Sequence, residues 1–211
     1  KNPNSLTSDD ISCLAVDKSG IIFIGTRNKG VDQLNPYSGK FTGIRNKNGD
    51  ATSLSDDRIS CILVDTVSHH VWIGTQSAGL NEFDPATWKC KRYMASPGNA
   101  IASNYITCLA KDKKRRIWIG TADNGLSMYD QMQNRFKHYG KSAVGISLSS
   151  LNIRDVFVDR DGKVWLATEN GLNYLNPETD SIVSFLHDDK VKYSLSSNDL
   201  TSVYQDKSGK I

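Results

Sequence analysis

The most regular feature of the chain is a short apolar run, closed by a small residue and threonine, that occurs four times. The runs are residues 22–26, 71–75, 117–121 and 164–168. Runs of this length, rich in β-branched and aromatic residues and bounded by turn residues, predict strands that are buried on both faces. Their fourth residue is glycine, or Ala167 in the last run, which predicts that a neighbouring element comes close there.

The apolar runs belong to a longer internal repeat of about 47 residues. An aliphatic residue that begins a preceding strand recurs at Ile11, Ile59, Ile106, Ile153 and Leu200. A second aliphatic series has the same spacing, at Leu6, Leu54, Ile101, Leu148 and Leu195. An acidic residue recurs with the same spacing, at Asp17, Asp65, Asp112, Asp159 and Asp206. A fixed period of this length indicates a solenoid, a propeller or another repeat array.

Each period contains four short strand patterns joined by tight turns. In the second repeat they cover residues 58–64, 71–75, 80–83 and 88–93. Four antiparallel strands per period are typical of a propeller blade. The sequence contains no amphipathic helical segment that would favour a solenoid instead. We therefore predict an all-β fold, a partial β-propeller over residues 1–211 with four blades and the start of a fifth. The repeats are 5–52, 53–100, 101–147, 148–193 and the incomplete 194–211.

The two ends of the chain also follow the repeat. Residues 207–211 match residues 18–21 of the first repeat, where a hairpin is predicted, so the chain stops inside that hairpin. Residues 1–4 resemble the linker that would follow a previous blade. We therefore expect the chain to be a piece of a longer propeller.

Charge excludes several classes of partner. The net charge is +3, with basic and acidic residues interspersed, which argues against a nucleic-acid-binding stripe. The one basic run, residues 113–116, falls in a predicted hairpin and is interpreted as a solvated turn. No apolar stretch approaches the roughly 20 residues needed to span a bilayer, so no membrane contact is predicted for this segment.

The cysteines indicate packing rather than chemistry. Cys13, Cys61 and Cys108 occupy the same position of three consecutive repeats. Equivalent side chains in neighbouring blades point the same way, which is unsuitable for a disulfide, so reduced packing residues are expected. Cys90 lies alone in a predicted outer strand. No zinc-ligand spacing occurs, and no metal or cofactor is predicted.

Two recurrent motifs could be mistaken for catalytic or phosphate-binding sites. Residues 25–30 have the glycine spacing of a phosphate loop but lack the lysine that must follow, and the same frame recurs in later repeats. The recurrent aspartate hairpin is better explained by a carboxylate that accepts backbone N–H bonds in a turn. No catalytic residue is predicted from either motif.

The second repeat resembles the two-component regulator propeller repeat at residues 53–59, Asp65, residues 71–75 and residues 79–85. Residues 193–200 resemble the opening of the same repeat. The chain departs locally from the family's pattern at three places: Phe23 replaces tryptophan, Ala167 replaces glycine, and Asp130-Gln131 replaces Asp-Pro. The resemblance implies a periplasmic sensor region of a bacterial hybrid two-component system. In such proteins two seven-bladed propellers precede a β-sandwich, a membrane helix and a histidine kinase, and many detect oligosaccharides. This segment has no kinase motif, so kinase activity would belong to other parts.

A ligand site is predicted on one face of the propeller. If the first strand of each blade is innermost, the loops between blades and the turns between second and third strands share a face, opposite the aspartate hairpins. Loops on a rigid scaffold commonly carry binding residues. The candidate ligand-binding residues are Arg27, Asn28, Arg58, Gln76, Tyr105, Asp123, Asn152, Arg154 and Glu169, and Asn104, Asn124 and Asn170 lie on the same predicted face.

Three functions remain open at this point. The first is a non-catalytic sensor of a small oligosaccharide, whose hydroxyl edges and C–H faces suit arginine and tyrosine. The second is a scaffold for protein–protein interaction or for homodimerisation of the full-length sensor, with Trp88 as an exposed anchor. The third is a propeller glycosidase or lyase, for which Asp155 and Glu169 are the one nearby carboxylate pair in the sequence.

Overall fold

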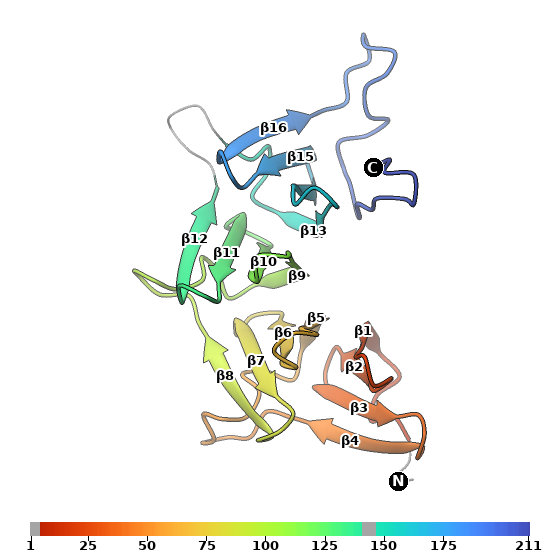
Figure 1. Cartoon of the computed structure of the whole chain (residues 1–211), viewed down its shortest axis with the longest axis vertical. Helices are drawn as coiled ribbons and strands as arrows, with labels where there is room; N and C mark the ends of the chain where they lie inside the picture. The colour runs from red at the N-terminus through yellow and green to blue at the C-terminus, as the bar shows by residue number, and fades with distance from the viewer. Residues whose placement is uncertain (1–4, 141–146) are drawn as a thin grey trace. The chain divides into compact units, whose positions relative to one another are not determined.

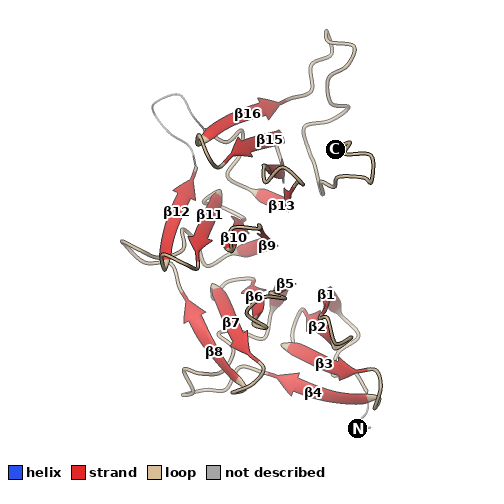
Figure 2. Ribbon diagram, viewed as in Figure 1, coloured by secondary structure: helices blue, strands red, loops and turns tan. Residues whose placement is uncertain are grey.

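The fold is all-β, as the sequence predicts. The computed structural model describes residues 5–140 and 147–211. Within those residues there are sixteen strands in four separate antiparallel sheets, and no helix (Figures 1 and 2). In every sheet, strands that are consecutive in sequence are neighbours in space, which is the meander of a propeller blade. The linker predicted for residues 1–4 and residues 141–146 of the third repeat lie outside the described residues.

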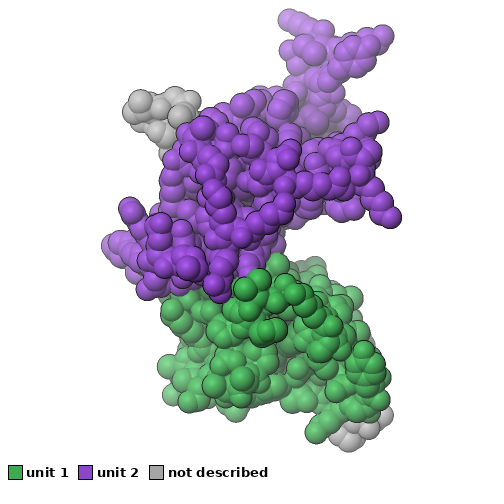
Figure 3. Space-filling model, viewed as in Figure 1, with its two compact units in different colours: residues 1–95, 104–106 green, residues 96–103, 107–211 purple. Residues whose placement is uncertain are grey.

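The first two blades form one compact unit, residues 1–95 with 104–106 (Figure 3). The strands of the first blade are β1 (Ile11–Val16), β2 (Ile22–Thr26), β3 (Val31–Asn35) and β4 (Lys40–Ile44). Those of the second are β5 (Ile59–Val64), β6 (Val71–Thr75), β7 (Leu80–Asp84) and β8 (Lys89–Tyr93). Strand β5 packs against β1 and β2, so a single core joins the two sheets.

The third and fourth blades form the second unit, residues 96–103 with 107–211. The third blade has β9 (Ile106–Lys111), β10 (Arg116–Thr121), β11 (Leu126–Asp130) and β12 (Arg135–Tyr139). The fourth has β13 (Ile153–Val158), β14 (Val164–Thr168), β15 (Gly171–Asn176) and β16 (Ser181–Phe185). Strand β13 packs against β10, and their core contains Trp118, Val156 and Leu166.

The repeated apolar runs are the second strands, and they are the most buried elements. Every residue of β6 is buried. The glycine at its fourth position is required, because a Cβ on Gly74 would lie 2.5 Å from the Sγ of Cys61 and 2.7 Å from Cγ2 of Ile106. The predicted close approach is thereby confirmed. None of the four cysteines, all of which lie in the described residues, forms a disulfide, and burial raises the pKa of Cys108 to about 12, which fits an inert packing residue.

The leucine series that opens each repeat anchors the chain to the blade's own third strand. Leu54 is fully buried, and the next residue, Ser55, donates its backbone N–H to the side-chain oxygen of Asn81 over 2.9 Å. The Asn81 side chain donates in return to the hydroxyl of Ser55. Ser149 and Asn173 repeat both bonds in the fourth blade. This polar clamp explains why a serine follows the buried leucine.

The recurrent aspartate is a turn residue, as predicted, and it has a second role. One carboxylate oxygen of Asp159 accepts the backbone N–H groups of Asp161 and Lys163. The other oxygen accepts the indole N–H of Trp165 over 2.8 Å. Asp112 accepts the indole N–H of Trp118 in the same way. In the third and fourth blades the aspartate therefore links the hairpin to the tryptophan of the second strand.

The basic run at residues 113–116 is not simply a solvated turn. Arg116 is the first residue of β10, and its side chain is only 12% exposed. Its guanidinium lies over the ring of Trp118 and bonds to Asp112 and Glu178. Lys114 pairs with the same glutamate at 2.7 Å. The sequence interpretation was wrong for Arg116, because this side chain packs over Trp118 and pairs with Asp112, and with Glu178 62 residues away.

The start of the fifth repeat packs on the fourth blade. The backbone N–H of Leu200 donates to the carbonyl of Thr168, and that of Val203 donates to the carboxylate of Asp155. The ring of Tyr204 lies 5.9 Å from that of Phe157. These contacts place residues 200–204 where the first strand of a fifth blade is predicted, although they have no ladder partner in the described residues and are not assigned as a strand.

Candidate ligand-binding site

The two loop sets that were predicted to share a face are hydrogen-bonded to each other within each unit. In the first unit, Gly30, in the turn after β2, donates to the carbonyl of Asp57, in the loop before β5, over 2.8 Å. Gly79, after β6, donates to the carbonyl of Asn104 over 3.0 Å. In the second unit Gly125 bonds in the same way to Leu151. The loop face, defined as these turns and inter-blade loops, is therefore a continuous surface in each unit.

Arg58 is the centre of the loop face in the first unit. Its guanidinium pairs with Asp56 at 2.8 Å and also donates to the hydroxyl of Ser77. Although partial burial acts to raise the pKa of Asp56, the hydrogen bonds from Arg58 outweigh it and the pKa lies below its usual value. Tyr105 is half exposed and close enough to raise the pKa of Arg58, after the larger effect of Asp56. Gln76 lies beside them, because its N–H donates to the carbonyl of Arg58.

Arg27 and Asn28 lie in the exposed turn after β2. The Nε of Arg27 is 3.3 Å from a carboxylate oxygen of Asp10, and both side chains are more than half exposed. The backbone N–H of Arg27 also donates to the carbonyl of Asp10. Arg27 therefore bonds to a residue of its own blade, and the other N–H donors of its guanidinium are exposed to solvent.

In the second unit, Glu169 and Asn152 are joined. The carboxylate of Glu169 accepts hydrogen bonds from the amide of Asn152 over 3.1 Å and from the hydroxyl of Ser150 over 3.2 Å. Asp123 lies exposed in the turn after β10. These side chains present amide and carboxylate groups, which can bond to hydroxyl-bearing ligands.

Arg154 lies in strand β13, directly after the aliphatic residue that begins it. The pairing of β13 with β14 shifts between Ile153 and Asp155, so Arg154 is the extra residue of a β-bulge. A bulge re-aims its side chain. The guanidinium of Arg154 pairs with Asp199 at 2.9 Å and remains about one third exposed.

The carboxylate pair considered for catalysis is engaged in separate structural bonds. Asp155 accepts the backbone N–H of Val203, and burial raises the pKa of its carboxyl, although the backbone bonds oppose this. Glu169 bonds instead to Ser150 and Asn152. Within the described residues no group of three or more histidine, cysteine or acidic side chains is placed to hold a metal ion. No helix there could cross a membrane.

Two features lie on the opposite face, an exposed tryptophan and a cavity. Trp88 is 41% exposed and has a positive φ of 59°, a conformation that bulky residues seldom adopt. Its ring packs edge-on against Phe83 at 5.2 Å. In the first unit a cavity also lies between the aspartate hairpins of the two blades. Sequence reasoning did not find this cavity, although Phe23 in place of tryptophan was its signal.

Three segments of the chain match the family model described as two component regulator propeller: residues 5–28, 100–123 and 147–170. Each runs from the opening of a repeat to the turn after its second strand. The second repeat is not among these segments, and its aspartate hairpin is one residue longer than the others. No curated protein sequence is significantly similar to the chain.

The fold is similar to solved extracellular domains of bacterial sensors. One is that of the hybrid two component system BT4673 from B. thetaiotaomicron, with a TM-score of 0.78, 20% identity, and coverage of 97% of this chain and 26% of that one. Another is the extracellular domain of the hybrid two component system BT3049 from the same organism, with a TM-score of 0.62 and 18% identity. The match covers 97% of this chain and 38% of that one. Virginiamycin B lyase from Staphylococcus aureus is also similar, with a TM-score of 0.62, 16% identity, and coverage of 85% and 56%. At these identities the likeness shows the propeller fold, and the chain spans about a quarter of the length of the first neighbour.

Proposed function

The chain carries repeats of the two component regulator propeller family, and from this premise we propose that it is an extracytoplasmic, non-catalytic sensor module that binds a small oligosaccharide. The signal passes to a kinase or other output region elsewhere in the full-length protein. The module belongs to the periplasm in this proposal, in keeping with its likeness to extracellular sensor domains.

The observation that carries the proposal is the polar cluster on the loop face of the first unit. Arg58 and Tyr105 precede the first strands of consecutive blades and are each about half exposed. The turn after β6 joins their two loops, because Gln76 donates to the carbonyl of Arg58 and Gly79 donates to the carbonyl of Asn104. A guanidinium and a tyrosine ring carried by these joined loops offer donors for hydroxyl or carboxylate groups and a flat surface for a sugar C–H face. The repeat framework stays the same while these positions differ between blades.

The arginines of the loop face favour an acidic sugar. Arg27, Arg58 and Arg154 are each paired with an exposed or partly exposed aspartate, namely Asp10, Asp56 and Asp199. An exposed ion pair contributes little stability, so a ligand carboxylate can replace the aspartate at small cost. Guanidinium groups also bind carboxylates through two parallel hydrogen bonds. Uronic-acid oligosaccharides therefore suit this surface better than neutral ones.

The test is calorimetric titration of the chain with a tetrasaccharide of galacturonic acid and with a neutral galactose tetrasaccharide. We expect the acidic sugar to bind more tightly. Arg58→Ala and Tyr105→Ala should each weaken binding about tenfold, the size expected for one lost contact. Thermal unfolding of both variants should change little, because the side chains are exposed.

Trp88→Ala is the matched control, since it removes an exposed aromatic residue from the opposite face. Binding lost in Trp88→Ala but kept in Arg58→Ala and Tyr105→Ala would refute the loop-face assignment. If neither sugar binds and the chain instead dimerises through Trp88, the scaffold function is correct. Cleavage of either sugar would establish an enzyme.

A further inference from the structure

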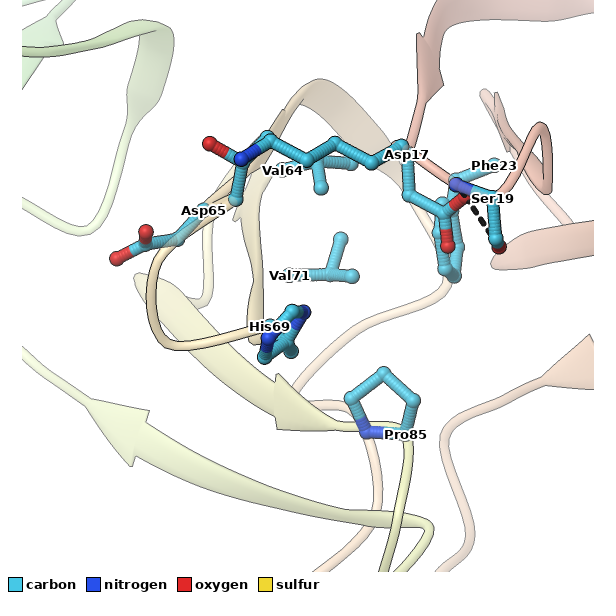
Figure 4. Close-up of a pocket in the computed structure, with 10 residues that line it drawn as sticks. Asp17, Ser19, Phe23, Val64, Asp65, His69, Val71 and Pro85 are labelled. Atoms are coloured by element: carbon cyan, nitrogen blue, oxygen red, sulfur yellow. Dashed lines mark hydrogen bonds between the residues drawn. The ribbon is translucent and has the colours of Figure 1, made fainter.

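The cavity in the first unit is formed where the aspartate hairpins of the first two blades meet the turn after β7. Its volume is about 150 Å³. Figure 4 shows Asp17, Ser19 and Phe23 from the first blade, and Val71, His69 and Pro85 from the second, around it. Phe23 and Val71 are fully buried, so the inner wall is rigid and apolar. A cavity of roughly this size can hold one benzene-sized molecule.

The second unit shows what occupies the equivalent place elsewhere in the chain. The repeat aligns Phe23 with Trp118, Ile21 with Arg116, and Ala86 with Glu178. In the second unit the Trp118 indole reaches Asp112, and the Arg116 guanidinium covers that indole and bonds to Glu178. All three replacements in the first unit are smaller or lack the polar group. These three substitutions leave space between the hairpins, and the longer aspartate hairpin of the second repeat forms part of the wall.

The polar chemistry of the cavity follows from the same comparison. One oxygen of Asp17 accepts the N–H groups of Ser19 and Ile21, as its counterparts do in the third and fourth blades. In those blades the other oxygen accepts a tryptophan indole N–H. In the part of the chain that the structure describes, no donor bonds to this second oxygen of Asp17. The cavity thus combines an apolar wall with a carboxylate oxygen that has room for an N–H donor.

We propose that this cavity is a second ligand site, separate from the loop face, that binds a planar aromatic molecule of one or two rings carrying an N–H donor. The ring packs on Phe23, Val64 and Val71, and the N–H donates to Asp17. The chain contains this arrangement twice in intramolecular form, as Trp118 with Asp112 and Trp165 with Asp159. In the first blade an external ring takes the place of the side chain.

Indole and indene are the probes, because they have the same shape and differ in the N–H group. The full chain is titrated with each while backbone amide shifts are followed by NMR. We expect saturable binding of indole with a Kd of roughly 0.1–1 mM, and shifts at Ser19, Val64 and Val71. Indene should bind about tenfold more weakly, since it cannot donate to the carboxylate.

Two substitutions separate the cavity from the donor. Phe23→Trp supplies the side chain that the third and fourth blades carry, so it should fill the cavity, preserve the fold and abolish indole binding. Asp17→Asn keeps an oxygen for the turn but loses the charge, and should lower the affinity for indole to that for indene. Both variants are first checked for an unchanged circular dichroism spectrum and unfolding temperature.

Arg58→Ala is the control, because it alters the loop face alone and should leave indole binding unchanged. Indole binding that persists in Phe23→Trp, or shifts confined to other residues, would overturn the site. Equal affinities for indole and indene would overturn the N–H donor class. These outcomes are independent of oligosaccharide binding at the loop face, so the two proposals fail separately.

Discussion

Gly74→Ala tests whether close packing between strands dictates the glycine of the repeated apolar run. The added Cβ would lie 2.5 Å from Cys61 Sγ and 2.7 Å from Ile106 Cγ2. Both distances are below van der Waals contact. Strand β6 and Ile106 are buried, so movement into solvent cannot relieve the contact with Ile106, whereas Cys61 is partly exposed. The substitution should therefore destabilise the protein although alanine suits a strand better than glycine.

The size of the effect follows from two opposing contributions. Overpacking a well-packed core typically costs about 1–3 kcal/mol. Replacing glycine by alanine within a strand recovers about 0.5–1 kcal/mol of conformational free energy. The net loss in free energy of unfolding is about 1–2 kcal/mol. For a chain of this length the unfolding temperature should fall by about 2–8 °C.

Urea unfolding followed by circular dichroism measures the change, and a double-mutant cycle with Cys61→Ala identifies its cause. Removing the Cys61 sulfur eliminates one of the two clashes. In the Cys61→Ala background, Gly74→Ala should therefore cost about 1 kcal/mol less than it does in the original chain. The contact with Ile106 remains, so the cost should not vanish.

Gly140→Ala is the matched control. A Cβ there would meet Leu151 at 3.6 Å, an ordinary contact distance, so its stability should hardly change. The packing argument is refuted if Gly74→Ala is as harmless as Gly140→Ala. It is also refuted if the cost of Gly74→Ala is the same with and without the Cys61 sulfur.

Two further predictions concern carboxylates. Asp159→Ala should lower the free energy of unfolding by about 3 kcal/mol, because two turn N–H groups and the Trp165 indole lose their acceptor. Asp17→Ala leaves no indole N–H without an acceptor, so it should lower the free energy of unfolding by about half as much. Urea titration of both variants measures the difference. Burial raises the pKa of Asp155 in the folded state, although the hydrogen bond from Val203 acts to lower it. The native state therefore binds the proton more tightly than the unfolded state does. As a result, the free energy of unfolding falls as pH rises from about 4 through that raised pKa. Asp155→Asn should remove this fall, and a chain that keeps the same pH dependence after the substitution would contradict it.

The blade architecture could be derived from the sequence because its signals are local and repeated. Asp65, the run 71–75 and Gly79 have counterparts at the same offsets, to within one residue, in the other three complete repeats. Each indicates a turn or strand formed by residues close in sequence. The four strands predicted for the second repeat match β5–β8 to within one residue at each end. The role of the recurrent aspartate in its turn followed from the same local chemistry.

Contacts between repeats could not be derived in this way. The pairing of Arg116 with Glu178, and the cavity shared by Asp17 and Val71, depend on how one sheet packs on the next. So does the joining of the loops that carry Arg58 and Tyr105, which bond to the same turn through Gln76 and Gly79. Such contacts join residues about one repeat apart, and no local pattern records which side chains meet there.

The sequence alone therefore determined the period, the strands and the turns of this protein, because hydrophobic alternation and turn chemistry act over a few residues. The tertiary structure decided which glycines are sterically required, which charges are neutralised and where a cavity remains. Those outcomes depend on side-chain volumes from two blades at once, and a difference as small as phenylalanine for tryptophan at residue 23 determines whether the space between the hairpins is filled.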